Sequence, residues 1–431
     1  MTTRRRFLAG VGTAAAVTLA GCSSLGGPEE RERDEIDPEA FEGEIGALTW
    51  PASPLPVHLP ESLVATHRTR ATELYASVPA DPSIPNEVVA ERLDEERGHL
   101  ETRLDEESDA GPALEALDDW RYTRGSAANL AGAYRAATGE DDGADVRDRR
   151  RTIRADLGDF VADLEYRAAD PIEAVQIYAT VEDLLGDVRR RVRPVHPYPD
   201  SPTAAVEQAG DAVEDVEDAA ASLADAREIR DTYLADRESV TSQWSRLIDG
   251  SRSMDYALGR TRETAGEFLQ EPDPGSVFDR DLTRLAERLY MTASRRVDAG
   301  SGGPGEFERR GHGEYATAIL DATRELAAIA VLRNVVDGIE SGQFADDVTA
   351  QSVIDAADEA RSAVDALADA TDPTLAVAVA RPGFGAYQGG RRDLEDHFLA
   401  PADAQAAFRY TAMYARVAPE AAGYLVDRLA S

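Results

Sequence analysis

The chain of 431 residues contains one cysteine, Cys22, and no lysine, so all 46 of its basic residues are arginines. A single cysteine excludes an intrachain disulfide, and therefore a fold that depends on disulfides. Asparagine is scarce as well, and none of Asn86, Asn129 and Asn334 stands in an N-x-S/T sequon, so N-glycosylation is not expected. Basic and aromatic residues form no stripe along the sequence, which argues against nucleic acid as a partner.

Acidic residues dominate the charge, with 82 Asp and Glu and a formal net charge of −36. This acidity has two interpretations: a surface that attracts cations or a basic partner, or an adaptation that keeps the protein hydrated in concentrated salt. The acids are spread along the whole chain, which favours adaptation, and the composition resembles that of proteins from extremely halophilic archaea. At ~1 M salt the Debye length is about 3 Å, so long-range attraction is nearly abolished there. At low salt we expect the repulsion to weaken the fold.

The N-terminus has the pattern of an export signal. Arg4, Arg5 and Arg6 precede an apolar run, residues 7–20, that is too short for a comfortable membrane span. The stretch "TRRRFLAG" resembles a twin-arginine export motif, and "LAGC", which ends at Cys22, resembles a lipobox. The resemblance implies a signal peptide over residues 1–21, cleavage before Cys22 and lipidation of that cysteine. The alternatives are a cleaved signal with an incidental cysteine and an uncleaved anchor.

The segment after the signal is expected to connect a folded body to the membrane. Residues 22–60 are acidic and rich in proline, which predicts a flexible tether, and residues 48–63, with Trp50, predict an extended strap before the first helix. The expected location is the extracytoplasmic face of the cell membrane, with the membrane as a partner through lipidated Cys22. A protein partner at this surface is a further expectation.

Hydrophobic periodicity predicts an all-α fold, because strand-like alternation is nearly absent. We expect antiparallel helical bundles or a stacked helical array, with an N-terminal bundle over residues 61–199 and a C-terminal helical region over 200–431. The second region begins with a coiled-coil-like helix, 203–248, whose partner is expected in the same chain, an intermolecular coiled coil being the alternative. Asp170 and Pro171 predict the start of another helix.

Motifs of catalysis and metal binding are scarce. The sequence has no G-x-S-x-G, no P-loop and no H-E-x-x-H, and lipidation of Cys22 would remove the one thiol. Glu96 and His99 form a single Glu-x-x-His, whereas a di-iron bundle needs two such motifs, so we expect them on a solvated surface. The sequence therefore predicts no catalytic residue, no metal site and no cofactor, and it favours a protein that is not an enzyme.

A rival hypothesis comes from "GHGEY", where His312 stands two residues before Glu314. This pair resembles the histidine–glutamate motif of imelysin-like helical surface proteins, which implies a metal-dependent or hydrolytic surface enzyme. Asp393 and His397 are four residues apart and are expected to form a surface ion pair. The preferred interpretation is a lipid-anchored extracytoplasmic helical protein with a binding or envelope-assembly role.

The segment "ARPGFGAYQGGRRDLEDHF", residues 380–398, differs most from the rest of the chain because it combines glycines, aromatic residues and paired arginines. It predicts a loop ahead of a helix, where backbone N–H groups and guanidinium groups would hold an anion or another ligand. The alternative is a connector that buries Phe384 and Tyr387 in the core. The candidate ligand residues are Gly383, Gly385, Tyr387, Arg391 and Arg392.

Overall fold

The computed structural model describes residues 41, 43–81, 83–105, 113–141, 143–193, 197–269, 274–278, 280–301, 306–395 and 400–430. These residues all belong to one compact unit. Helices make up nearly all of its regular structure, and its one sheet is a pair of two-residue strands, so the all-α prediction is confirmed. None of the helices in these ranges combines the length and the hydropathy that a membrane crossing needs.

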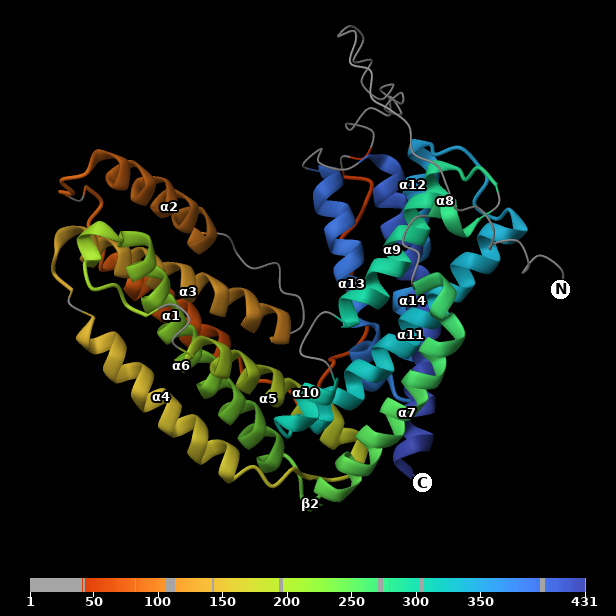
Figure 1. The fold of residues 1–431 in the computed structure, drawn as a ribbon, viewed down its shortest axis with the longest axis horizontal. Coiled ribbons are helices and arrows are strands. Elements are labelled where there is room, and N and C mark those ends of the chain that lie inside the picture. The colour runs from red at the N-terminus through yellow and green to blue at the C-terminus, as the bar shows by residue number, and fades with distance from the viewer. Residues whose placement is uncertain are drawn as a thin grey trace, which may run out of the picture. The chain divides into compact units, whose positions relative to one another are not determined.

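The first group of helices is built around α3, which packs against α1 and α6 (Figure 1). Small residues let α3 and α6 approach closely: a Cβ added at Gly132 would lie 2.7 Å from Cβ of Val213. The expected partner in the same chain is therefore found, and it is α3. The elements of this group are α1 (Glu61–Ala76), α2 (Glu87–Asp105), α3 (Ala113–Thr138), α4 (Ala144–Ala162), α5 (Pro171–Arg191), the 3-10 turn η2 (Pro202–Ala204) and α6 (Val206–Ala235).

The predicted single helix over residues 203–248 is wrong, because the chain leaves the helix over residues 236–243. Helix α6 ends at Ala235, and strand β2 (Thr241–Ser242) pairs antiparallel with β1 (Arg167–Ala168). The β-branched residues at 240 and 241 suit this extended backbone, and N–H of Gln243 donates to the carbonyl of Tyr166 at 2.9 Å. The coiled-coil-like helix therefore ends with α6, and α7 begins a second group of helices.

The second group is centred on α11 and α14. Helix α14 packs against α13, α12, α9 and α11. The side chains of α11 are buried over most of its length, which explains why it shows so little polar periodicity. The elements are α7 (Trp244–Leu269), α8 (Pro274–Val277), α9 (Arg284–Ser301), α10 (Glu306–Gly311), α11 (Tyr315–Ser341), α12 (Ala350–Asp365), η3 (Ala366–Asp369), α13 (Pro373–Glu395) and α14 (Pro401–Ala430).

The predicted loop at 380–398 is wrong over residues 380–395, because α13 runs as a helix through Pro382 to Glu395; residues 396–398 lie outside the described ranges. Proline has no N–H, so the carbonyl of Ala378 lacks its helical donor. Arg324 of α11 replaces that donor, with Nε at 3.1 Å and Nη2 at 2.9 Å from the Ala378 oxygen. Glycine also permits contact with α14, since a Cβ at Gly390 would lie 2.9 Å from Cβ of Ala407. Packing partners thus override a local sequence that disfavours a helix.

Helices α5 and α11 join the two groups through a buried carboxyl. Glu182 of α5 is 1% exposed, and it accepts hydrogen bonds from the backbone N–H of Thr317 at 2.7 Å and of Ala316 at 3.3 Å. These are N–H groups of the first turn of α11, which have no partner inside that helix. The hydroxyl of Tyr166 lies 2.8 Å from Oε1 of Glu182 and 2.8 Å from the carbonyl oxygen of Gly313. One side chain therefore completes the start of a helix in the other group.

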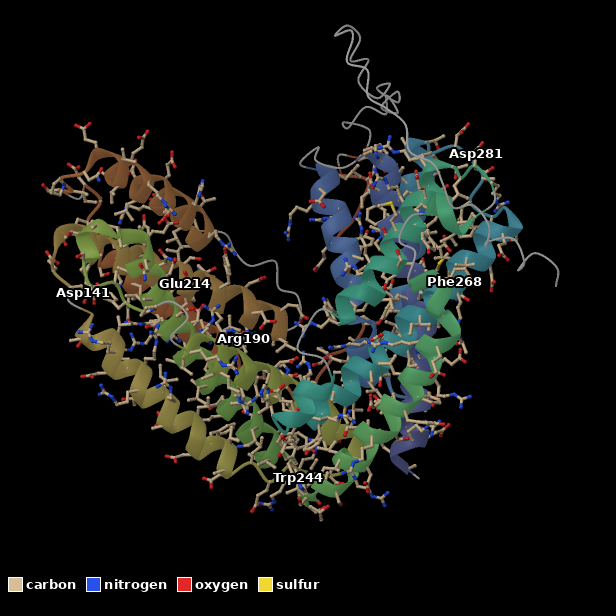
Figure 2. All side chains as sticks on the ribbon, in the orientation of Figure 1. Asp141, Arg190, Glu214, Trp244, Phe268 and Asp281 are labelled. Carbon is tan, nitrogen blue, oxygen red and sulfur yellow. The ribbon has the colours of Figure 1, made fainter. Side chains whose placement is uncertain are left out.

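Aromatic rings cover the same junction. Trp244, labelled in Figure 2, begins α7 directly after the short sheet. Its ring centroid lies 5.0 Å from that of Tyr166 and 5.1 Å from that of Tyr315, the latter edge-on. Such ring pairs add to the stability that burial provides.

The strap, defined here as residues 43–60, packs on the body instead of forming part of a free tether. Its side chains at Ile45, Leu55, Val57 and Leu59 are buried, which fixes an otherwise irregular backbone. The predicted flexible tether over 22–60 is therefore wrong for this part. The predicted strap over 48–63 is confirmed up to Pro60, because α1 begins at Glu61. Residues 22–40 lie outside the described ranges. The cause is the recurrence of apolar residues between prolines, which buries one side of the strap.

The strap contacts both groups of helices. The hydroxyl of Tyr387 in α13 donates to the carbonyl of Gly46 at 2.7 Å, and Nη2 of Arg237, after α6, donates to the carbonyl of Pro56 at 2.5 Å. The ring of Trp50 packs edge-on against Phe384, with centroids 4.4 Å apart.

Candidate functional site

The strap covers a cavity of about 1090 Å³ between the start of α3 and the end of α13. We call it the strap cavity. It brings together the two sequence segments that differ most from the rest of the chain, the proline-rich stretch with Trp50 and the stretch with Tyr387, Arg391 and Arg392. Leu48, Leu55 and Val57 of the strap supply apolar surface, and charged groups line the opposite sides. Such a combination is typical of small-molecule sites.

One wall of the strap cavity is acidic and comes from the first two turns of α3. Burial raises the pKa of Glu115 to about 7, against the lowering effect of Arg381. Oε1 of Glu115 lies 3.2 Å from Nε of Arg381, outside hydrogen-bond geometry, so both carboxylate oxygens are buried without a hydrogen-bond partner. Asp118, the next acid, is held by Arg381 at 3.0 Å and by Arg121. Glu115 is therefore an acceptor that the protein itself leaves unsatisfied.

The other wall is basic and comes from the end of α13. Arg392 is exposed, and no ion pair or hydrogen bond engages it within the described residues. Desolvation raises the pKa of Asp119, and the positive charges of Arg103 and Arg392 oppose this shift. Arg392 thus acts electrostatically on the acidic wall without pairing with it.

The predicted ligand residues divide into two sets. Tyr387, Arg391 and Arg392 line the strap cavity. Gly383 and Gly385 do not, because they lie inside α13, where their N–H groups belong to the helix. The proposed cradle of glycine N–H groups is therefore wrong, while anion binding by the two arginines stays a prediction. The alternative of buried aromatic residues is confirmed for Phe384 and Tyr387, which are 1% and 0% exposed.

Sequence reasoning missed Glu115, Asp118, Asp119 and Arg381. The stretch "LEALDDW" reads as an ordinary amphipathic helix start, where acidic residues favour the helix dipole. No local signal separates a solvated acid from one covered by a strap that lies far away in the sequence.

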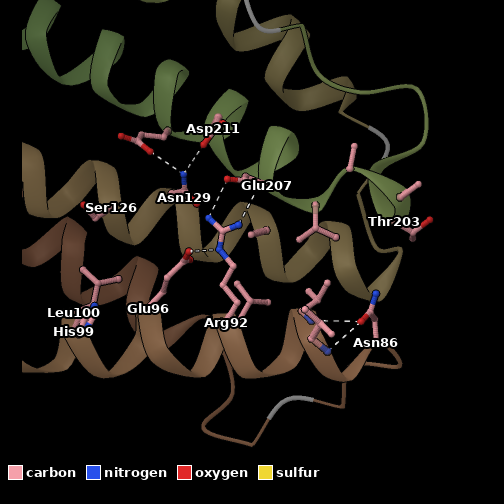
Figure 3. A pocket seen from close by; sticks show the side chains of 18 of the residues that line it. Asn86, Arg92, Glu96, His99, Leu100, Ser126, Asn129, Thr203, Glu207 and Asp211 are labelled. Atoms are coloured by element: carbon pink, nitrogen blue, oxygen red, sulfur yellow. Dashed lines mark hydrogen bonds and ion pairs between the residues drawn. The ribbon is translucent and has the colours of Figure 1, made fainter. Parts of the chain in front are cut away.

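A second hollow is a groove of about 680 Å³ between α2, α3 and the start of α6 (Figure 3). Its charges are largely paired with one another. Arg92 bridges Glu96 at 3.1 Å and Glu207 at 2.9 Å, and Nδ2 of Asn129 donates to Asp211 at 3.0 Å and Glu214 at 2.8 Å. The groove is therefore a weaker candidate for a ligand site.

The histidines do not form a shared centre within the described ranges. Glu96 of the Glu-x-x-His pair is engaged by Arg92, and His99 lines the same groove. Glu314 forms ion pairs with Arg189 and, at 3.8 Å, with Arg309, whereas His312 is exposed. In the part of the chain that the structure describes, no three His, Cys, Asp or Glu side chains are placed to hold a metal ion. His196 and His397, and with His397 the predicted pair with Asp393, lie outside that part.

A buried ion cluster lies in the core of the first group and serves packing. Glu217 of α6 is 1% exposed and forms ion pairs with three arginines: Arg70 at 3.0 Å, Arg124 at 2.7 Å and Arg149 at 2.7 Å. Burial alone would raise the pKa of Glu217, but these arginines outweigh it and lower the pKa to about 2. Nearby, Nε2 of buried His67 lies 2.9 Å from Asp225. Every charge of this cluster has a partner, so it ties α1, α3, α4 and α6 together.

Comparison with known proteins divides the chain at the junction between the two groups. Residues 62–239 match a family described as a domain of unknown function (DUF8262), and residues 244–427 match a second domain of unknown function (DUF8264). The first match contains α6, which packs on α3 and α5, whereas the sequence analysis divides the chain between residues 199 and 200. No curated protein and no solved structure matches the chain.

Proposed function

We propose that this chain is a lipid-anchored protein of the extracytoplasmic membrane face that binds a small polar solute in the strap cavity. The observation that carries the binding role is the buried carboxylate of Glu115, whose two oxygens have no hydrogen-bond partner at the cavity wall. A buried acceptor without a donor costs free energy, which a ligand donor would recover. The twin-arginine and lipobox patterns ending at Cys22 support the location.

The anchoring is tested by replacing Cys22 with serine. We expect the wild-type protein in the detergent phase after phase separation, with the mass of residues 22–431 plus lipid. Cys22→Ser is expected in the aqueous phase. A wild-type mass that includes residues 1–21 would contradict the lipobox interpretation.

The binding role is tested by filling the cavity. Ala52 lines the strap cavity, and Ala52→Trp would occupy part of its volume, whereas Ala235→Trp at the exposed end of α6 is the matched control. Saturation-transfer NMR of the mature chain with a polar extract of its own cells should show solute signals that Ala52→Trp removes and Ala235→Trp retains. No solute signal from the wild type, or equal signals from all three proteins, would contradict binding in this cavity.

A surface hydrolase working in the same cavity is the second candidate. It is favoured by the pKa of Glu115, about 7, because a carboxyl that titrates near neutral pH suits general acid–base catalysis. In that case the extract solute would be converted during incubation, and Glu115→Gln would stop conversion while binding persisted. Binding without conversion favours the solute-binding protein.

A further inference from the structure

The two walls of the strap cavity carry opposite charges, and each wall has a charged group without a hydrogen bond in the described part of the protein. On the acidic wall, Glu115 is the carboxylate whose two oxygens are both buried without a hydrogen-bond partner. On the basic wall, Arg392 has no ion pair or hydrogen bond in the described ranges. Arg381 and Arg121 do have carboxylate partners, Arg381 in Glu115 and Asp118, and Arg121 in Asp225. Within the described residues, Arg392 is therefore the guanidinium of this wall that is available to a ligand.

We propose that the strap cavity binds a zwitterionic ligand of amino-acid type, with its ammonium group at Glu115 and its carboxylate at Arg392. This inference rests on the proposed function and specifies its ligand. A carboxylate accepts from an ammonium group, and a guanidinium donates to a carboxylate, so the ligand would supply Glu115 with a hydrogen-bond donor and Arg392 with an acceptor. The apolar strap residues that line the cavity, Leu55 and Val57, would contact the ligand's carbon chain.

Charge selection explains why both ends are needed. A simple cation can bind at many acidic residues of a chain whose net charge is −36, so it is not directed to this cavity. A simple anion is repelled by the same net charge. In concentrated salt these long-range terms are screened, and only direct contacts discriminate among ligands. A ligand that contacts both Glu115 and Arg392 gains two charge-assisted hydrogen bonds. A ligand with only an ammonium group or only a carboxylate gains one.

The test is calorimetry on the mature chain in high-salt buffer, with probes that vary the charge separation. The zwitterions are glycine, β-alanine and γ-aminobutyrate, and the half-ligands are methylammonium and acetate. We expect one zwitterion to bind more tightly than both half-ligands. Glu115→Gln and Arg392→Gln should each weaken it by about 10- to 100-fold, the loss expected for a charge-assisted hydrogen bond. The exposed controls Glu238→Gln and Arg252→Gln should leave its affinity unchanged.

A second readout uses the proton on Glu115. Because its pKa is about 7, the carboxyl is mostly protonated at pH 6 and must lose its proton to bind an ammonium group. Calorimetry in two buffers of different ionisation enthalpy should then report release of about 0.9 proton per ligand at pH 6. Glu115→Gln should release none. The charged and titratable groups that share the cavity with this carboxyl are His58 of the strap, Asp118 and Asp119 of α3, and Arg381, Arg391 and Arg392 of α13.

The outcomes separate this inference from the proposed function. The zwitterion inference is overturned if extract solutes bind but no zwitterion does. It is also overturned if Glu115→Gln and Arg392→Gln both leave the zwitterion affinity unchanged. In either case the proposed binding of a solute stands. If neither extract nor probes bind the wild type, both fail. Thermal unfolding checks that the variants fold, and Arg392→Lys, which keeps the charge, should bind more tightly than Arg392→Gln.

Discussion

Glu182 gives the sharpest prediction, because its hydrogen-bond partners and its burial both favour the protonated form. The phenol of Tyr166 has one proton but lies at hydrogen-bond distance from both Glu182 and the carbonyl of Gly313. A carbonyl only accepts, so one phenol proton satisfies both acceptors fully only when Glu182 is protonated and donates to the phenol. The geometry therefore favours the protonated carboxyl. Burial, the largest cause, agrees with this by raising the pKa of Glu182 to about 8.

The sign of the pH dependence follows directly. The folded pKa, about 8, exceeds the ordinary value of 4.5, so the folded state keeps a proton that the unfolded chain releases. This contribution to stability is complete below pH 4.5 and is lost as the pH rises through 8. At about 1.36 kcal/mol per pH unit, about 2–3 kcal/mol disappears between pH 6 and pH 9.

The perturbation is Glu182→Gln, which keeps the shape and fixes the neutral form. Its amide group would donate to Tyr166, and its carbonyl would accept from Thr317. We expect the variant to match the wild type within about 1 kcal/mol at pH 4, to be about 2 kcal/mol more stable at pH 6 and to be about 4–5 kcal/mol more stable at pH 9. Urea unfolding in constant high salt measures the difference, and Glu238→Gln on the surface controls for loss of one charge. Parallel stability curves of wild type and Glu182→Gln would refute the reasoning.

The remaining predictions concern packing, charge and salt. Glu217→Gln should lower the free energy of unfolding by about 2–3 kcal/mol at pH 7, since three arginines lose their carboxylate, and the difference from wild type should vanish as the pH falls toward 2. Gly132→Ala should destabilise by about 1–3 kcal/mol through the contact with Val213, whereas Gly98→Ala, with no atom within 4 Å, should stabilise by about 0.5–1 kcal/mol; thermal unfolding ranks both. The midpoint of thermal unfolding should rise with salt, and a midpoint that falls or stays constant between low and multimolar salt would contradict the adaptation hypothesis.

Much of the fold could be predicted because its signals are local. Asp170 accepts from N–H of Ile172 and Glu173 and starts α5 at Pro171, as the sequence predicts. Helical periodicity likewise established the all-α class. The break after Ala235 escaped prediction because β1, the partner of β2, lies over 70 residues earlier in the chain. Helix α13 escaped because Arg324, which satisfies the carbonyl freed by Pro382, belongs to another helix.

Only part of the strap cavity could be predicted, because some of its residues are marked by local composition and others only by tertiary burial. Arg391 and Arg392 stood out by composition, and they do line the cavity. Glu115 did not, because its character depends on burial beneath the strap, and burial comes from tertiary structure. Its raised pKa has no counterpart in the sequence around it.

The strap also sets an order of events during synthesis. Gly46 is among the first described residues to leave the ribosome, yet Tyr387, whose hydroxyl it accepts from, follows 341 residues later. Contacts so distant in sequence form late, since the intervening chain must exist and its ends must meet. The strap therefore cannot be seated until α13 has been made, so the strap cavity closes late in synthesis. An export route that carries finished proteins, as the twin-arginine pattern implies, would let this closure happen before the chain leaves the cell interior.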